Sequence, residues 1–172
     1  GGRFIARSID TLLKHMPVVL KRAHEHKGAA FVEIFQNCLV YNDRTFSRFT
    51  DKTLAADNQI DVIHGEPLVF GRERNKGLRV RPGTLELEIV TPGENGIGMD
   101  DILVHDETSR TLATMLVSMD PPAFPVALGV IYCDPAPSYV ESLRSKVSEL
   151  KGPGPKASIN DLLRSGHTWQ AG

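Results

Sequence analysis

The residues of this chain whose types suit metal, redox or nucleophilic chemistry are two cysteines and six histidines. Cys38 and Cys133 lie far apart, so no CxxC motif exists, which excludes a thioredoxin-type pair and a zinc ribbon. Two thiols are also too few for the four thiolates of an iron–sulfur cluster. The cysteines therefore exclude a self-contained redox or metal centre of these kinds in this chain.

The two cysteines have different surroundings. Cys133 ends an apolar segment, where an unreactive buried thiol is common. Cys38 directly follows an apolar segment and lies between Gln36-Asn37 and Asn42-Asp43. A thiol among amides and backbone N–H groups is better placed to act as a ligand or nucleophile than one in a core. Spacing alone leaves an ordinary thiol as the alternative.

The histidines and glycines form no recognised catalytic motif. His24 and His26 are two positions apart, which puts them on different faces of a helix, and no HExxH is present. Residues 105–107 (His-Asp-Glu) are typical of a surface turn, so solvated or hydrogen-bonded histidines are the alternative to metal ligands. The glycine-rich residues 93–98 lack the Lys-Ser/Thr of a phosphate loop and predict a connection between β-segments.

Length and charge limit the class of protein. The 172 residues fit one globular domain, or one and a fragment. A formal net charge of −1 argues against a general nucleic-acid binder. No apolar run approaches the ~18 residues of a membrane span, and no secretory signal is present. We therefore expect no nucleic-acid or membrane partner and a cytoplasmic location.

The first part of the chain predicts a βαβ unit. The pattern predicts a strand at Phe4–Arg7. Ser8 is predicted to cap a helix that starts again at Pro17 and ends at Gly28. Residues 29–35 form the second strand. Strand, helix and strand in this order indicate a parallel pair. Ligands of open α/β sheets bind beyond the carboxyl ends of strands, which here means residues 36–44.

The remainder is predicted to be mixed. Short helical turns are expected over 45–58 and a β-rich region over 60–104, with strands at 60–64, 67–70, 77–81, 85–90 and 102–105. Further along, the patterns predict a helix at 109–119, a buried strand at 124–132, helices at 138–150 and 158–164, and a Gly-Pro hinge at 152–155.

Residues 31–43, FVEIFQNCLVYND, resemble the strand-and-loop signature of the β subunit of 2-oxoacid:ferredoxin oxidoreductases. Residues 4–10, 26–28 and 162–169 resemble the same subunit, so the resemblance covers essentially the whole chain. The Gln-Asn form before Cys38 is more similar to the 2-oxoglutarate branch than to the pyruvate branch. The implied fold is α/β: the last βαβ of a thiamine diphosphate-binding parallel-sheet domain (1–40), then a β-rich α+β C-terminal extension (41–172).

The resemblance implies an enzyme that decarboxylates a 2-oxoacid on thiamine diphosphate with Mg²⁺. The acyl group would pass to coenzyme A, and electrons would pass through a [4Fe-4S] cluster to ferredoxin. An α subunit is the implied partner. Cys38 matches one cluster thiolate, and the other three would come from an N-terminal segment. This sequence has no Gly-Asp-Gly, so no thiamine or Mg²⁺ residue is assigned.

Two interpretations of the chain remain open. It begins Gly1-Gly2-Arg3-Phe4 without a methionine, which indicates either a tag remnant or the later part of a longer protein. As a C-terminal fragment of such a β subunit, it should be inactive alone and should expose a sheet edge and an apolar face. The rival is a non-enzymatic α+β protein-binding module. An upstream CxxC and Gly-Asp-Gly in frame would favour the fragment.

Overall fold

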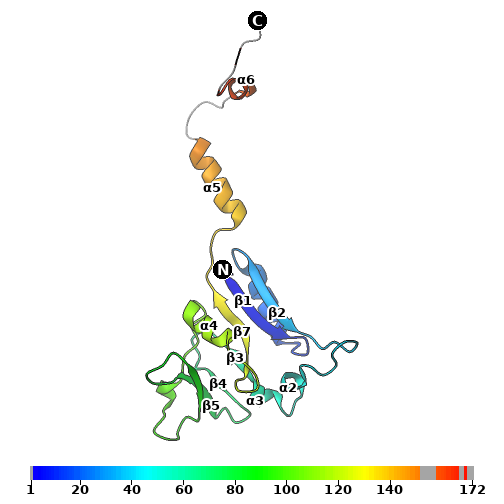
Figure 1. Ribbon diagram of the computed structural model, residues 1–172, viewed down its shortest axis with the longest axis vertical. Coiled ribbons are helices and arrows are strands. Elements are labelled where there is room, and N and C mark those ends of the chain that lie inside the picture. Colours follow the sequence, from blue (N-terminus) through cyan, green and yellow to red (C-terminus); the bar gives the residue numbers. More distant parts are fainter. Residues whose placement is uncertain (1, 152–157, 167–168, 170–172) are drawn as a thin grey trace. The chain divides into compact units, whose positions relative to one another are not determined.

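The computed structural model describes residues 2–151, 158–166 and 169. The chain divides into two units, Gly1–Ala136 and Pro137–Gly172 (Figure 1). Among the described residues, no helix is both long enough and apolar enough to cross a membrane.

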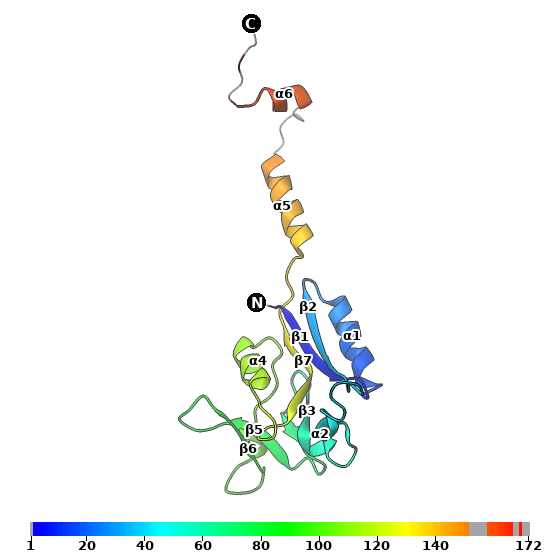
Figure 2. The same ribbon diagram turned by 45° about the vertical axis from the view of Figure 1, so that its right-hand side comes forward.

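The predicted βαβ unit is present. β1 (Phe4–Ile9) and β2 (Ala30–Phe35) are parallel neighbours, paired from Phe4↔Ala30 to Ile9↔Phe35. Helix α1 (His15–Glu25) connects them and lies against the sheet (Figure 2). Gly28, at a φ of +115°, follows α1 as the sequence predicts for a chain reversal after a helix.

The predicted start of that helix was wrong. Ser8 does not cap a helix; it lies in β1, fully buried, because the ladder with β2 continues to Ile9. Its hydroxyl is satisfied by the ring of His15, with 2.9 Å between Oγ and Nδ1. Helix α1 begins only at His15, so Pro17 falls in its first turn, where its missing N–H costs nothing.

Two later segments complete the main sheet. β7 (Val126–Cys133) pairs antiparallel with β1, and β3 (Gln59–Val62) pairs parallel with β7, giving the order β2-β1-β7-β3. Every residue of β7 is buried. β3 therefore belongs to the same sheet as the βαβ unit, and the contacts do not separate residues 1–40 from the later part of this unit. The division at residue 40 stays a prediction about a longer protein.

The β-rich region forms a second sheet of three antiparallel strands, β4 (Val69–Phe70), β5 (Lys76–Val80) and β6 (Leu87–Val90). The strand predicted at 102–105 was wrong. A short 3₁₀ helix, η1 (Met99–Asp101), precedes a segment that makes only the isolated bridge Pro67↔Val104. In that segment the Leu103 carbonyl accepts the N–H of Leu68, and the Leu103 N–H donates to the carbonyl of Leu78 in β5.

The shorter helices follow their sequence signals. α2 (Ser47–Thr50) and α3 (Ala55–Asn58) are single turns in the predicted region 45–58. α4 (Arg110–Val117) begins after Ser109, whose hydroxyl accepts the N–H of Leu112, as expected of an N-cap.

The core lies on both faces of the main sheet. On one face α1 contributes Val19 to a cluster with strand residues, among them Phe4 and Val130. On the other face α4 and the second sheet build the largest cluster, in which Leu116 and Leu78 are fully buried. Strand β2 is an edge of the sheet, and its Phe31 is 60% exposed. The predicted sheet edge is therefore found, and it carries an exposed aromatic side chain.

The second unit contains α5 (Tyr139–Lys151) and α6 (Ile159–Leu163), close to the predicted helices. α6 starts with a capping box between Ser158 and Asp161. The predicted hinge at 152–155 lies outside the described residues.

Candidate functional site: the Cys38 loop

The loop that carries Cys38 leaves the carboxyl end of β2. Because β1 and β2 are parallel, this is the sheet edge at which α/β proteins bind ligands. Phe35, the last residue of β2, stacks on Phe46 with ring centroids 4.8 Å apart, so the loop between them is fixed at both ends. Cys38 thus lies at the edge that the sequence predicted.

Asn37 holds the loop closed. Its side-chain oxygen accepts the N–H of Arg44 at 2.8 Å, and its side-chain nitrogen donates to the Asp43 carboxylate at 2.9 Å. Inside this clamp Cys38 and Asn42 form an antiparallel bridge, with the N–H of Asn42 donating to the Cys38 carbonyl at 3.0 Å. Arg44 adopts a φ of +59°, which turns its N–H toward Asn37. The side chain of Asn37 therefore fixes a five-residue turn.

Backbone N–H groups of the turn influence the ionisation of the thiol. Hydrogen bonds from the backbone of Tyr41, of Val40 and, more weakly, of Asn42 hold the pKa of the Cys38 thiol below its usual value, although the side chain is exposed. Donors aimed at a sulfur stabilise the thiolate, which is the form that ligates metals and attacks electrophiles. This arrangement fits a single thiolate ligand with its hydrogen-bonding shell.

The tip of the turn is apolar and exposed. Leu39, Val40 and Tyr41 are 79%, 82% and 91% exposed. Three consecutive exposed apolar side chains beside an accessible thiol are typical of a surface that another protein segment covers.

Cys133 lies at the other end of the sheet. Its partner in the ladder is Phe4, the first residue of β1, whereas Cys38 follows the last residue of β2. The Cys133 sulfur is 3.7 Å from Nδ1 of His26, and burial, followed by the charge of Glu107, raises the pKa of this thiol. The structure therefore does not bring the two cysteines together. In the part of the chain that it describes, no three His, Cys, Asp or Glu residues are grouped to hold a metal.

We expect the two thiols to differ sharply in reactivity. In the folded chain, Cys38 should alkylate with iodoacetamide with an apparent pKa below that of free cysteine, because the loop stabilises its thiolate. Cys133 should remain unmodified. Replacing Asn37 with alanine should raise the apparent pKa of Cys38 toward the free value. Mass spectrometry of alkylated peptides across a range of pH measures the modification of each cysteine and the apparent pKa of Cys38. Equal pKa values for Asn37→Ala and wild type would contradict the clamp.

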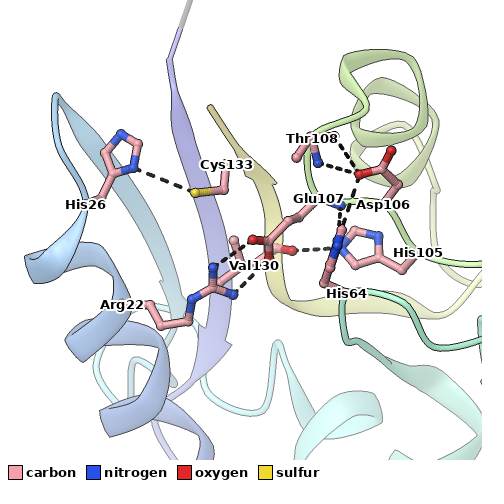
Figure 3. Close-up of polar contacts among 9 residues, drawn as sticks. All are labelled: Arg22, His26, His64, His105, Asp106, Glu107, Thr108, Val130 and Cys133. Carbon is pink, nitrogen blue, oxygen red and sulfur yellow. Dashed lines mark hydrogen bonds and ion pairs between the residues drawn. The ribbon is translucent and has the colours of Figure 1, made fainter. Parts of the chain in front are cut away.

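A second polar cluster joins helix α1 to the sheet (Figure 3). Both terminal nitrogens of Arg22 donate to the Glu107 carboxylate at 2.8 Å, and this pairing is the main reason that the pKa of Glu107 is lowered. The Glu107 carbonyl accepts the N–H of Cys133 at 2.7 Å, and its own N–H donates to Nδ1 of His64 at 3.2 Å. Glu107 therefore ties α1, β7 and the loop at residue 64 to one another.

His105, expected in a surface turn, is instead buried at 1% exposure. Its Nε2 donates to the carbonyl of Val130 at 2.8 Å, which leaves Nδ1 unprotonated, buried and without a partner among the described residues. Burial is the main reason that the pKa of His105 is lowered. The ring is thus a core component that is held neutral.

This burial predicts a pH dependence of stability. Because the folded-state pKa of His105 lies below its unfolded value of ~6.5, its contribution is complete above that pH and is lost as pH falls through the lowered pKa. His15 has a pKa lowered by burial in the same direction. We expect the free energy of unfolding, from urea titrations at pH 7.5 to 5, to fall on acidification. His105→Gln keeps a donor for the Val130 carbonyl, and its free energy of unfolding should fall less steeply with pH than that of the wild type. The same steepness in both would contradict a buried, neutral His105.

The chain matches no protein-family model. It is 30% identical over 181 aligned residues to the 2-oxoglutarate oxidoreductase subunit KorB of Mycobacterium tuberculosis, covering 96% of this chain and 44% of that protein. It is 36% identical over 81 residues to the β subunit of a 2-oxoacid:ferredoxin oxidoreductase of Saccharolobus solfataricus, covering 45% of this chain and 27% of that protein.

A solved structure shares the fold. The 2-oxoglutarate:ferredoxin oxidoreductase of Magnetococcus marinus aligns over 98% of this chain and 42% of its own, with a TM-score of 0.58 and 18% identity. The mixed α/β fold of this chain, with a parallel-containing sheet and an antiparallel sheet, is therefore shared with that structure.

The class of fold is thus mixed α/β, with a thiol-bearing loop at the carboxyl end of a parallel strand. More particularly, the chain is related to the β subunits of 2-oxoacid:ferredoxin oxidoreductases, as the Cys38 segment predicted. It spans less than half the length of these curated relatives.

Proposed function

We propose that this chain is the C-terminal part of the β subunit of a 2-oxoacid:ferredoxin oxidoreductase. The complete enzyme would oxidatively decarboxylate a 2-oxoacid, transfer the acyl group to coenzyme A and pass electrons to ferredoxin. The observation that carries the proposal is the Cys38 loop, whose sequence, position after β2 and backbone donors all suit a thiolate ligand. The similarity to the KorB subunit along 96% of the chain and to a β subunit along 45% of it supports the proposal.

The loop fits the role of one cluster ligand. Cys38 would bind one iron of a [4Fe-4S] cluster, which supplies one-electron transfer when present. The N–H groups of Tyr41 and Val40 would remain directed at the sulfur and stabilise its negative charge, which favours the reduced state of the site. Three further thiolates would have to come from outside this chain, because its second cysteine lies at the opposite end of the sheet.

The remaining cofactors belong to the complete enzyme. Thiamine diphosphate and Mg²⁺ are part of the proposal through the family resemblance, and no residue of this chain is assigned to them. The partners proposed are an α subunit, ferredoxin, a 2-oxoacid and coenzyme A, in the cytoplasm.

We favour 2-oxoglutarate as the 2-oxoacid. The Mycobacterium tuberculosis relative is named as a 2-oxoglutarate oxidoreductase subunit, and the Magnetococcus marinus enzyme has 2-oxoglutarate, coenzyme A and succinyl-CoA bound. The Gln36-Asn37 pair before Cys38 is consistent with that branch.

Anaerobic co-expression of the complete β subunit with its α subunit tests the proposal. The purified enzyme should reduce ferredoxin when given 2-oxoglutarate and coenzyme A, faster than with pyruvate. This chain alone should have no activity. Reduction of ferredoxin with none of a panel of 2-oxoacids would contradict the proposed function, and preference for pyruvate would contradict only the substrate.

A further inference from the structure

Helix α5 carries an apolar stripe that no described residue of its own unit buries. Val140, Leu143, Val147 and Leu150 follow one another at intervals of three, four and three residues, the a and d positions of a heptad repeat. They are all exposed, from 39% for Val147 to 87% for Leu150, and α5 has no buried residue. An amphipathic helix of this kind gains most of its stability by packing that stripe against a surface.

The charges beside the stripe have one sign. Positions e and g flank the a and d positions on a helix, and here they are occupied by Arg144, Lys146 and Lys151. The acidic residues Glu141 and Glu149 fall at the outer b and c positions. Side chains at the rim of a helical contact meet the rim of the partner, so this helix presents an apolar stripe with a cationic border.

That border argues against a second copy of α5 as the occupant. In a parallel pair, a g residue faces the following e residue of the partner, which would set Lys146 against Lys151. In an antiparallel pair, e faces e and g faces g, so cations meet again. Like charges at these positions select against self-pairing. The complementary surface has carboxylates at its rim.

The start of α5 is fixed in advance of any contact. Ser138 and Glu141 form a reciprocal cap, with the Ser138 N–H donating to the Glu141 carboxylate at 2.7 Å and the Glu141 N–H donating to the Ser138 hydroxyl at 3.2 Å. A helix that is already started loses less conformational entropy when it docks.

We propose that α5 is a docking helix for the α subunit, which receives it in an apolar groove rimmed by Asp and Glu side chains. The inference rests on the proposed function, since it takes the partner from that enzyme. The inference adds two details to the proposed function: the segment of this chain that contacts the α subunit, and the chemistry of the surface that receives it. The contact would be a helix in a groove, with complementary charges at the rim.

Two sets of substitutions with the same change in net charge test the rim. Arg144→Gln, Lys146→Gln and Lys151→Gln together remove three positive charges beside the stripe. Ser142→Glu, Ser145→Glu and Ser148→Glu add three negative charges at the outer c, f and b positions. In complete β subunits, at ~0.15 M salt, the first set should weaken binding to the α subunit about tenfold, and the second by less than about threefold because of screening.

A third variant tests the stripe itself. Leu143→Ala with Val147→Ala keeps helix propensity and should weaken α-subunit binding by about a hundredfold, as loss of central apolar anchors does. Dissociation constants from isothermal titration, with helix content checked by circular dichroism, measure all three. Salt dependence of binding should also decrease in the glutamine variant.

The outcomes separate this inference from the proposed function. If the wild-type β subunit neither binds the α subunit nor yields activity, the proposed function is wrong. If the wild type assembles and the stripe and rim variants assemble equally well, the docking inference is wrong. Self-association of the chain through α5 in sedimentation equilibrium would overturn it in favour of a second copy. A loss of thermal stability of this chain alone in Leu143→Ala/Val147→Ala would overturn it in favour of packing within the chain.

Discussion

Replacement of Cys38 by serine in the proposed complete enzyme is expected to abolish or destabilise its proposed [4Fe-4S] cluster. The alcohol of serine is a much poorer ligand for iron than a thiolate whose pKa is already lowered by the N–H groups of Tyr41 and Val40. The electron paramagnetic resonance signal of the reduced cluster should be lost. Ferredoxin reduction should fall to about one hundredth of wild type or less, the upper range for loss of a metal-site interaction.

Cys133→Ser is the matched control. It removes the other thiol of the chain, at the opposite end of the sheet, and should leave both the signal and the rate near wild type. A full-strength cluster signal with normal ferredoxin reduction in Cys38→Ser would refute the role of this loop. Loss of the signal in Cys133→Ser instead would reassign the ligand.

Substitution of Gly129 by alanine should destabilise the chain more than the same change at a loop glycine. Gly129 lies in β7 at a φ of +121°, and a Cβ there would lie 2.7 Å from the carbonyl oxygen of Val62. That oxygen belongs to the neighbouring strand β3, and Gly129 also pairs with Arg7 on its other side, so neither strand can move away. Strain and overlap together should cost about 3 kcal/mol of unfolding free energy.

Gly83→Ala separates the two contributions. Gly83 also has a positive φ, +78°, but a Cβ there would meet nothing within 4 Å. Gly83→Ala should lower the unfolding free energy only through the backbone preference of glycine for a positive φ, by about 1 kcal/mol. Urea unfolding followed by circular dichroism gives both values. Equal losses in the two variants would show that the contact with Val62 carries no cost.

Local patterns in the sequence predicted the elements that are built from neighbouring residues. The apolar runs at 4–7 and 29–35, with a helix between them, were enough for a parallel pair, because that connection has few alternatives. Ser109 marked the start of α4 because an N-cap is decided by the residues next to it. The same local rule failed at Ser8, whose strand pairing with β2 outweighed its preference for a cap.

Long-range pairing was not accessible in this way. β7 was predicted to be a buried strand, but its antiparallel neighbour β1 lies more than a hundred residues away, and periodicity reports burial without naming a partner. His105 was placed in a surface turn because the carbonyl that binds it, at Val130, is distant in sequence. The pair of Arg22 and Glu107 has no sequence signal at all, since its members come from α1 and from the loop before α4.

The candidate site was found from one residue and its neighbours. Cys38 stood out because amide side chains and backbone N–H groups were expected around it, but the sequence did not indicate that Asn37 closes the loop. The bond from the Arg44 N–H to Asn37 goes with a positive φ at Arg44, which a non-glycine residue adopts only where its surroundings require it.

The clamp formed by Asn37 also bears on how a metal centre would be assembled. The loop holds its shape through hydrogen bonds that involve no metal, so the chain pays the entropy of ordering it when the domain folds. Insertion of iron and sulfide then requires no further ordering at this ligand. We expect the assembly of the site to be limited by delivery of the cluster, because the Cys38 loop is already ordered before the cluster arrives.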